Sequence, residues 1–197
     1  MKNLVAAIKN MQEYTGLRQE LERGHRVSLY GAAPVHRAHF VSALYEDLRR
    51  PICVITADDA AARHFAADIE SFLGVKAAVL PSRDMIFHDA EGVSRETEQQ
   101  RIAALHSIVS GRKNLIVGSA EAFMLRTIPS DRLLSCGAVI EEGKSYDISQ
   151  LCNILTDCGY RRCEQIEGAG QFALRGGILD IFPAGSAAPV RAEFWCD

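Results

Sequence analysis

Short apolar runs alternate with helical patterns along the first two thirds of the chain. Four runs rich in Val, Ile and Leu predict β-strands, at 26–30, 51–56, 75–80 and 114–117. Apolar residues three or four positions apart predict helices, chiefly over 2–14, 59–72, 94–108 and 119–125. Strands that alternate with helices are typical of a parallel sheet with helices on both faces, so we predict an α/β fold here.

The pattern changes after Ser135. One predicted helix, 147–158, precedes closely spaced strands between 162 and 195 that are separated by glycine-rich turns. This order is typical of an α+β domain with antiparallel strands. We therefore predict a larger domain over 1–134 and a smaller domain over 135–197.

Composition and charge narrow the classes of function. With 197 residues, of which 48% are hydrophobic and 24% charged, the chain is typical of a globular protein with a buried core. A formal net charge of −3 does not favour a dedicated nucleic-acid binder. A local basic patch that binds DNA stays open as an alternative, and its candidates are Arg161, Arg162 and Arg175.

The sequence also bears on location and completeness. No apolar run is long enough to cross a membrane and no secretion signal is recognisable, so we expect a cytoplasmic protein with its cysteines reduced. The six cysteines form no C-x-x-C pair, which disfavours a zinc ribbon. Because the chain stops within an apolar run without a polar tail, we expect it to be part of a larger protein.

Residues 31–38 stand where an α/β domain would bind the phosphates of a nucleotide. A phosphate loop requires G-x-x-x-x-G-K-[ST], whose amides wrap phosphate and whose hydroxyl binds magnesium. This segment reads GAAPVHRA: Gly31 is kept, but the last three functional positions are occupied by His36, Arg37 and Ala38. A side chain at position 36 obstructs the phosphate and Ala38 cannot hold magnesium. We predict a degenerate loop without nucleotide hydrolysis.

A metal site is also disfavoured. His36 and His39 have a spacing that suits a metal on a helix, but no Asp, Glu or Cys shares that face within one turn. We therefore predict no metal site.

The segment near the carboxyl end predicts a charged and aromatic surface. Alternation in a strand over 189–195 directs Arg191, Glu193 and Trp195 to one face and the apolar residues between them to the other. Arg and Trp are enriched at protein-binding hot spots. In the alternative interpretation, Trp195 belongs to the core and Arg191 pairs locally with Glu193 or Asp180.

The motifs of this region resemble those of a known family. FALRGGILDIFP at 172–183 and PVRAEFWCD at 189–197 closely resemble the signature of the UvrB-like N-terminal module of bacterial transcription-repair coupling factors (Mfd). Segments that look like further blocks of this family are LPSRDMIFHDAEGVSRETEQQRIAALHSI at 80–108, NLIVGSAEAFMLR at 114–126 and CGYRRCEQIEGAGQFALRGG at 158–177. UvrB itself is similar but keeps an intact phosphate loop, so the degenerate loop favours the coupling factors.

The resemblance implies an architecture and a function. It implies a degenerate RecA-like, helicase-like domain over 1–134 and a small UvrA-binding domain over 135–197. In such a family the complete protein uses ATP and magnesium in a separate motor to displace stalled RNA polymerase from DNA. This chain would then recruit UvrA in transcription-coupled nucleotide excision repair, without a cofactor. The alternative is a nucleotide-binding fragment of a UvrB-like helicase.

The resemblance also implies which residues bind UvrA. Carried over position by position, they are Arg175, Arg191 and Trp195, with Phe172 and Glu193 at the edge of the surface. The family commonly has Phe where this chain has Trp195, so an aromatic contact is kept.

Overall fold

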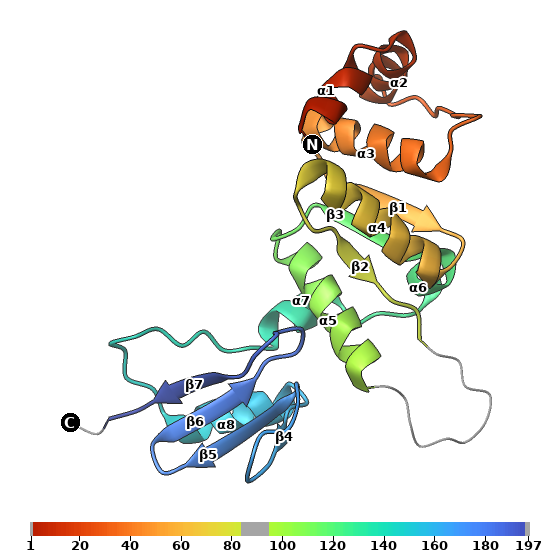
Figure 1. Ribbon diagram of the computed structural model, residues 1–197. Helices are drawn as coiled ribbons and strands as arrows, with labels where there is room; N and C mark the ends of the chain where they lie inside the picture. Colours follow the sequence, from red (N-terminus) through yellow and green to blue (C-terminus); the bar gives the residue numbers. More distant parts are fainter. Residues whose placement is uncertain (1, 84–94, 196–197) are drawn as a thin grey trace, which may run out of the picture. The chain divides into compact units, whose positions relative to one another are not determined.

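The computed structural model describes residues 2–83 and 95–195 (Figure 1). The chain divides into two compact units, one formed by Met1–Ser82 and Gly111–Leu125 and the other by Arg83–Ser110 and Arg126–Asp197. The predicted α/β class is confirmed, since the first unit holds a parallel sheet and the second a mixed sheet. The domain division predicted between residues 134 and 135 stays a prediction.

The first unit is built on a three-stranded parallel sheet in the order β1-β3-β2. Its strands are β1 (Ile52–Thr56), β2 (Ala78–Leu80) and β3 (Leu115–Ser119). Its helices are α1 (Lys2–Lys9), α2 (Gln12–Glu22), α3 (Pro34–Leu48), α4 (Asp59–Leu73) and α6 (Ala120–Met124).

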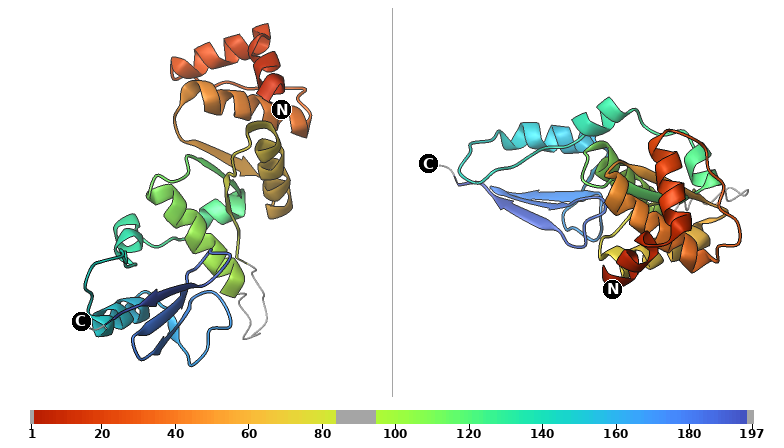
Figure 2. Two further views of the ribbon diagram at one scale, coloured as in Figure 1. Left: turned by 60° about the vertical axis from the view of Figure 1, so that its left-hand side comes forward. Right: turned by 90° about the horizontal axis from the view of Figure 1, so that it is seen from above.

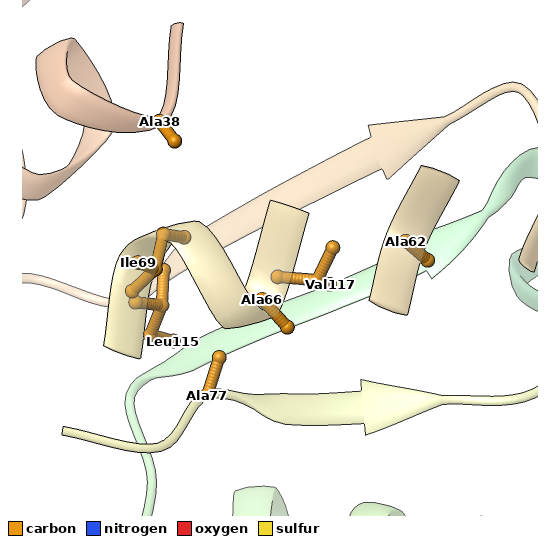
Figure 3. Packing of buried hydrophobic residues seen from close by; sticks show 7 residues of the cluster. All are labelled: Ala38, Ala62, Ala66, Ile69, Ala77, Leu115 and Val117. Atoms are coloured by element: carbon orange, nitrogen blue, oxygen red, sulfur yellow. The ribbon is translucent and has the colours of Figure 1, made fainter. Parts of the chain in front are cut away.

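Helix α4 covers one face of this sheet, and its ends are set by local chemistry. The Asp58 carboxylate accepts a hydrogen bond from the Ala61 N–H at 2.7 Å, and Gly74 ends the helix in the left-handed conformation. Small and branched side chains of α4 then pack on the strands. The core of this unit is formed by Ala38, Ala62, Ala66, Ile69, Ala77, Leu115 and Val117 (Figure 3). The alanines leave room for a close approach of helix and sheet.

One predicted strand does not form. Residues 26–30 are irregular, and Val27, Leu29 and Tyr30 are exposed. A strand needs a neighbour for its backbone hydrogen bonds. Within the described residues, β1 is an edge strand that pairs only with β3. Residues 26–30 do not pair with its open edge. The prediction of a strand here was wrong because local composition does not supply a pairing partner.

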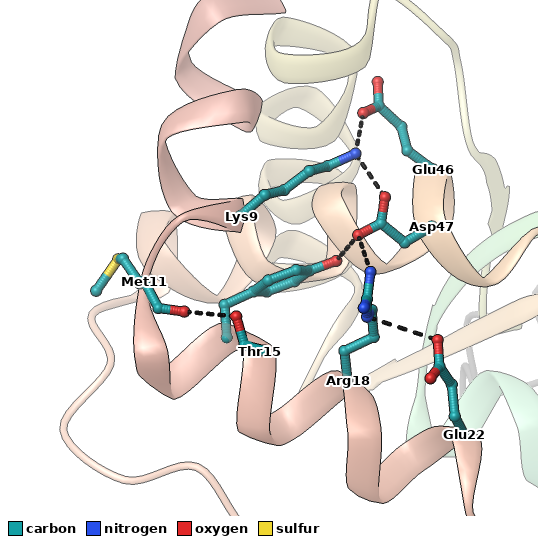
Figure 4. A network of polar contacts seen from close by, with 8 residues as sticks. Lys9, Met11, Thr15, Arg18, Glu22, Glu46 and Asp47 are labelled. Atoms are coloured by element: carbon teal, nitrogen blue, oxygen red, sulfur yellow. Dashed lines mark hydrogen bonds and ion pairs between the residues drawn. The ribbon is translucent and has the colours of Figure 1, made fainter.

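A polar network fixes α1 and α2 to α3 (Figure 4). Asp47 of α3 accepts hydrogen bonds from Lys9 Nζ and from the Tyr14 hydroxyl, both at 2.7 Å. Arg18 Nη1 lies 3.6 Å from the same carboxylate. Burial opposes ionisation of Asp47, yet the bonds from Lys9 and Tyr14 prevail and lower its pKa. The ionised Asp47 thus joins both leading helices to α3, and Lys9 Nζ also donates to Glu46 of α3 at 2.8 Å.

The second unit contains a four-stranded sheet in the order β4-β5-β6-β7. Its strands are β4 (Arg161–Arg162), β5 (Gln171–Arg175), β6 (Ile178–Phe182) and β7 (Val190–Glu193). Strand β4 runs parallel to β5, whereas β5, β6 and β7 form the predicted antiparallel set. Its helices are α5 (Arg95–Val109), α7 (Ser130–Ser135) and α8 (Ile148–Asp157).

Helix α8 lies along one face of this sheet (Figure 2). The core between them is formed by Leu151, Cys152, Leu155, Phe172 and Leu179. Side chains alternate along a strand, so the neighbours of Phe172 and Leu179 are directed to the opposite face. Within the described part of the chain, no helix is both long and apolar enough to span a membrane.

Candidate protein-binding site

Three charged residues meet on the sheet face that α8 does not cover. In the strand register, Asp180 of β6 is opposite Arg191 of β7 and opposite Ala173 of β5. Arg175 is two positions further along β5, on the same face as Ala173 and diagonal to Asp180. The central strand thus places one carboxylate between an arginine from each neighbouring strand.

The carboxylate binds both arginines directly. Arg191 Nε donates to Asp180 Oδ1 at 2.6 Å, and Arg191 Nη2 donates to Oδ2 at 3.0 Å. Arg175 Nη2 donates to the same Oδ2 at 3.0 Å. The hydrogen bonds from Arg191, with a further one from Arg175, hold the pKa of Asp180 below its usual value. Asp180 is therefore a carboxylate at neutral pH.

Burial differs sharply within this trio. The Asp180 side chain is only 12% exposed, whereas those of Arg175 and Arg191 are 60% and 54% exposed. The carboxylate is enclosed by its partners, while both guanidinium groups keep N–H donors that face solvent. The trio carries a net charge of one positive unit, and its outward guanidinium groups can donate to anionic groups, while Glu193 on the same face adds one negative charge.

The indole of Trp195 lies next to this region in the chain and is 83% exposed. Its neighbour Phe194 packs into the core instead, where its ring contacts Tyr146 edge-on at a centroid distance of 6.4 Å. Trp195 is thus directed away from the core, as the alternation predicted. A large exposed aromatic ring and outward guanidinium donors on the same segment of chain are typical of a protein-binding surface.

A glycine pair sets the position of this aromatic segment. Gly176 and Gly177 form the turn between β5 and β6, and Gly176 has a φ of +62°. The Phe194 N–H donates to the Gly177 carbonyl at 2.8 Å. A Cβ on Gly177 would lie 2.5 Å from the Phe194 carbonyl oxygen. Only glycine therefore permits this close approach of the two backbones.

The structure sorts the predicted site residues. Arg175 and Arg191 both bind Asp180. Arg191 thus pairs locally with Asp180, as the alternative interpretation predicted. Phe172 is fully buried, so its side chain cannot touch a partner and we omit it from the surface. Glu193 is exposed next to Trp195, as expected for an edge position.

Sequence reasoning did not select Asp180 as a site residue. The signal was present: Asp180 is the only charged residue within the apolar strand ILDIF, where an ion needs a partner.

The basic candidates for DNA binding, Arg161 and Arg162, are exposed on β4. Arg162 and Arg175 line one shallow groove together with Glu164.

The segment 31–38 is a short loop that continues into the first turn of α3. No strand precedes Gly31 within the described residues, and Arg37 Nε donates back to the Ala32 carbonyl at 2.9 Å. Ala38 has no exposed surface and belongs to the core against α4. The position of the magnesium-binding hydroxyl is therefore taken by an internal packing residue.

The histidine pair in this segment also has a structural explanation. His39 stacks on Phe72 at a centroid distance of 4.6 Å, and its Nε2 lies 2.7 Å from the Leu4 carbonyl oxygen. His36 is exposed. Among the described residues, no group of three or more His, Cys, Asp or Glu side chains could hold a metal ion.

The carboxyl ends of the parallel strands, where open α/β sheets bind ligands, are joined by internal hydrogen bonds. Asp59 accepts from the Ser119 hydroxyl at 2.6 Å and from the Ser82 N–H and hydroxyl at 2.8 and 3.0 Å. Burial opposes ionisation of Asp59, but the bonds from Ser119 and Ser82 lower its pKa. This carboxylate ties α4 to the ends of β2 and β3 and has a structural role.

Comparisons with known proteins agree with the predicted resemblance. Residues 139–197 match the family described as the UvrB interaction domain. The chain is 28% identical to the transcription-repair-coupling factor of Bacillus subtilis over 99% of its own length and 17% of that protein. It is 29% identical to the factor of Myxococcus xanthus over 90% of its length and 16% of that protein.

UvrB proteins are similar as well. The chain is 26% identical to the UvrABC system protein B of Thermus thermophilus, over 92% of this chain and 30% of that protein. The chain thus spans about a sixth of the length of the coupling factors that it matches. The resemblance read from the motifs is confirmed, and the charged and aromatic surface lies within the matched segment 139–197.

Proposed function

We propose that this chain, as a relative of the transcription-repair coupling factors, recruits UvrA to RNA polymerase stalled at DNA damage. Its second unit makes the contact, through Arg175, Arg191 and Trp195. The observation that carries the proposal is the exposure of two arginines held on one carboxylate, together with the exposed indole of Trp195 two residues after the end of β7. This surface belongs to the segment that matches the UvrB interaction domain.

Each side chain has a definite part in the proposed contact. The guanidinium groups donate charge-assisted hydrogen bonds to acceptors on UvrA, because their outward N–H groups are not used by Asp180. Trp195 fills an apolar site and excludes water around those bonds. Glu193 lies at the rim, where a charge affects the association rate more than the affinity.

The chain itself acts as a binding module and does not hydrolyse nucleotide in this proposal. The buried Ala38 and the inward bond of Arg37 support this part of it. ATP and magnesium then belong to a motor elsewhere in the complete protein, as do the contacts with RNA polymerase and DNA. The proposal places the protein in the cytoplasm, where a bacterial chromosome is transcribed and repaired.

The test is a binding measurement between UvrA and the 197-residue chain. We expect Arg191→Ala and Trp195→Ala each to weaken binding by at least about tenfold, since central Arg and Trp residues dominate such interfaces. Arg161→Ala is the matched control, because it removes an exposed arginine from the same sheet and should leave the affinity unchanged. Thermal unfolding verifies that the variants fold. Wild-type affinity in both test variants would refute the proposal.

A further inference from the structure

The geometry points to Asp180 as a positioning residue that fixes Arg175 and Arg191 side by side for two acidic groups on the partner. This inference rests on the proposed function. It deepens it by assigning a role to a residue that does not itself reach the partner. It also gives the chemistry of the surface that UvrA must present, namely carboxylates that meet the two guanidinium groups.

The placement of the trio supports this role. Asp180 is on β6, between the strands that carry the two arginines, and binds both within 3.0 Å. Its side chain is 12% exposed and enclosed by the groups it binds. It therefore acts on a partner through the arginines.

The pattern of donors shows what is left for a partner. Asp180 takes Nε and Nη2 of Arg191 but only Nη2 of Arg175. Within the described part of the chain, these two guanidinium groups make no hydrogen bonds besides those to Asp180. The Nη1 group of each arginine can therefore donate outward. A guanidinium that is bound on one edge can still donate hydrogen bonds to a carboxylate on its other edge.

Asp180 favours binding because it orders the two arginine side chains before the partner arrives. Arginine side chains on a surface sample many rotamers, and a partner must immobilise them when it binds. Two guanidinium groups held close together also repel each other unless an anion lies between them. Asp180 removes both costs in the free protein, because it orders the pair and neutralises one of its charges.

The variant Asp180→Asn separates this role from a plain charge effect. The amide has nearly the same shape, but it lacks the charge and has only one acceptor oxygen, and its NH2 group faces a guanidinium donor, so it cannot accept all three hydrogen bonds. If only net charge mattered, removal of a negative charge would tighten binding to an acidic surface. If positioning matters, binding weakens. We expect Asp180→Asn to weaken UvrA binding by at least about tenfold, against the Coulombic trend.

Glu193→Gln is the matched control for charge. Glu193 is an exposed acid on the same strand as Arg191 and acts on it only through its charge. Because Glu193 lies at the rim, we expect Glu193→Gln to associate faster with an acidic surface of UvrA and to bind it more tightly than the wild type. In a background of Arg175→Ala with Arg191→Ala, Asp180→Asn should have no further effect, because it acts through those residues.

A second variant keeps the inference testable if Asp180→Asn does not fold. Arg191→Lys keeps the positive charge but cannot offer both Nε and Nη2 to Asp180, so we expect it to weaken binding as well. Unchanged or tighter binding in a folded Asp180→Asn protein overturns the inference, as does wild-type binding by Arg191→Lys. If the arginine and tryptophan variants bind like the wild type, the proposed function itself fails, which is a distinct result.

Discussion

Replacing Gly177 by alanine would place a methyl group where the backbone of Phe194 already lies. The added Cβ would be 2.5 Å from the Phe194 carbonyl oxygen, and carbon atoms of this kind are hardly ever found within 3.0 Å of another heavy atom. The obstructing atom belongs to the backbone, so no side-chain rotation relieves the overlap. The end of β7 and the turn before β6 must therefore separate by at least about 0.5 Å.

The energetic cost follows from this displacement. The bond from the Phe194 N–H to the Gly177 carbonyl, now 2.8 Å long, moves toward or beyond the limit of about 3.2 Å for a good hydrogen bond. Its loss costs about 1 kcal/mol. Forcing the backbones apart costs about 1–3 kcal/mol more, as for other overpacked sites. We expect Gly177→Ala to lower the free energy of unfolding by about 3 kcal/mol.

Two neighbouring glycines provide matched controls for a urea-unfolding assay. Gly168 has open space around its Cβ position and an ordinary φ, so Gly168→Ala should change stability by less than about 1 kcal/mol. Gly176 also has open space but a φ of +62°, so Gly176→Ala should cost about 1 kcal/mol through backbone strain alone. The expected order of destabilisation is Gly177, then Gly176, then Gly168.

The same variants connect stability with binding. Because Trp195 directly follows Phe194, Gly177→Ala should also weaken UvrA binding, while Gly168→Ala should not. A Gly177→Ala protein as stable as Gly168→Ala, with wild-type affinity for UvrA, would show that the close approach of the two backbones does not set this surface.

Four further predictions concern the first unit. Ser119→Ala removes a hydrogen bond to the Asp59 carboxylate and should lower the free energy of unfolding by about 2 kcal/mol, measured by urea unfolding. Because the folded pKa of Asp59 is below its value of 3.8 in the unfolded chain, its contribution to stability is complete above pH 3.8 and is lost as the pH falls through the folded pKa. Asp59→Asn should therefore reduce the loss of stability at acidic pH. An unchanged pH dependence of the free energy of unfolding would contradict this role of Asp59. Asp47→Ala leaves the Tyr14 hydroxyl unpaired in a buried site and should cost about 2 kcal/mol, with α1 and α2 gaining faster amide hydrogen exchange. Calorimetry with ATP and magnesium should show no binding to the 197-residue chain, whereas binding that Arg37→Ala abolishes would favour a nucleotide site.

Local chemistry made much of the fold predictable. Asp58 and Gly74 fix the ends of α4 through a carboxylate cap and a left-handed residue, and both signals can be read from sequence. The prediction of a strand at 26–30 was wrong, because the apolar run gives no information on which backbone would pair with it. Strand formation depends on a neighbour, and a neighbour is a property of the tertiary structure.

The proposed binding surface was predictable to a similar degree. Strand alternation placed Trp195 and Arg191 outward, because side chains of a strand alternate whatever the surrounding fold. The role of Asp180 required the register of three strands, which no local pattern specifies. The same holds for Gly177, whose near contact with Phe194 is made by residues distant in sequence.

The buried position of Ala38 has a consequence for attempts to re-engineer an ATPase from this chain. Writing Gly-Lys-Ser into positions 36–38 would recreate the letters of a phosphate-binding motif. The new serine hydroxyl, however, would be buried in the apolar cluster that contains Ala38 instead of reaching a metal ion. The run at 26–30, outside the sheet, would give the loop no rigid base. Creating a working nucleotide loop would therefore require rebuilding the packing beneath α3, because Ala38 belongs to the core.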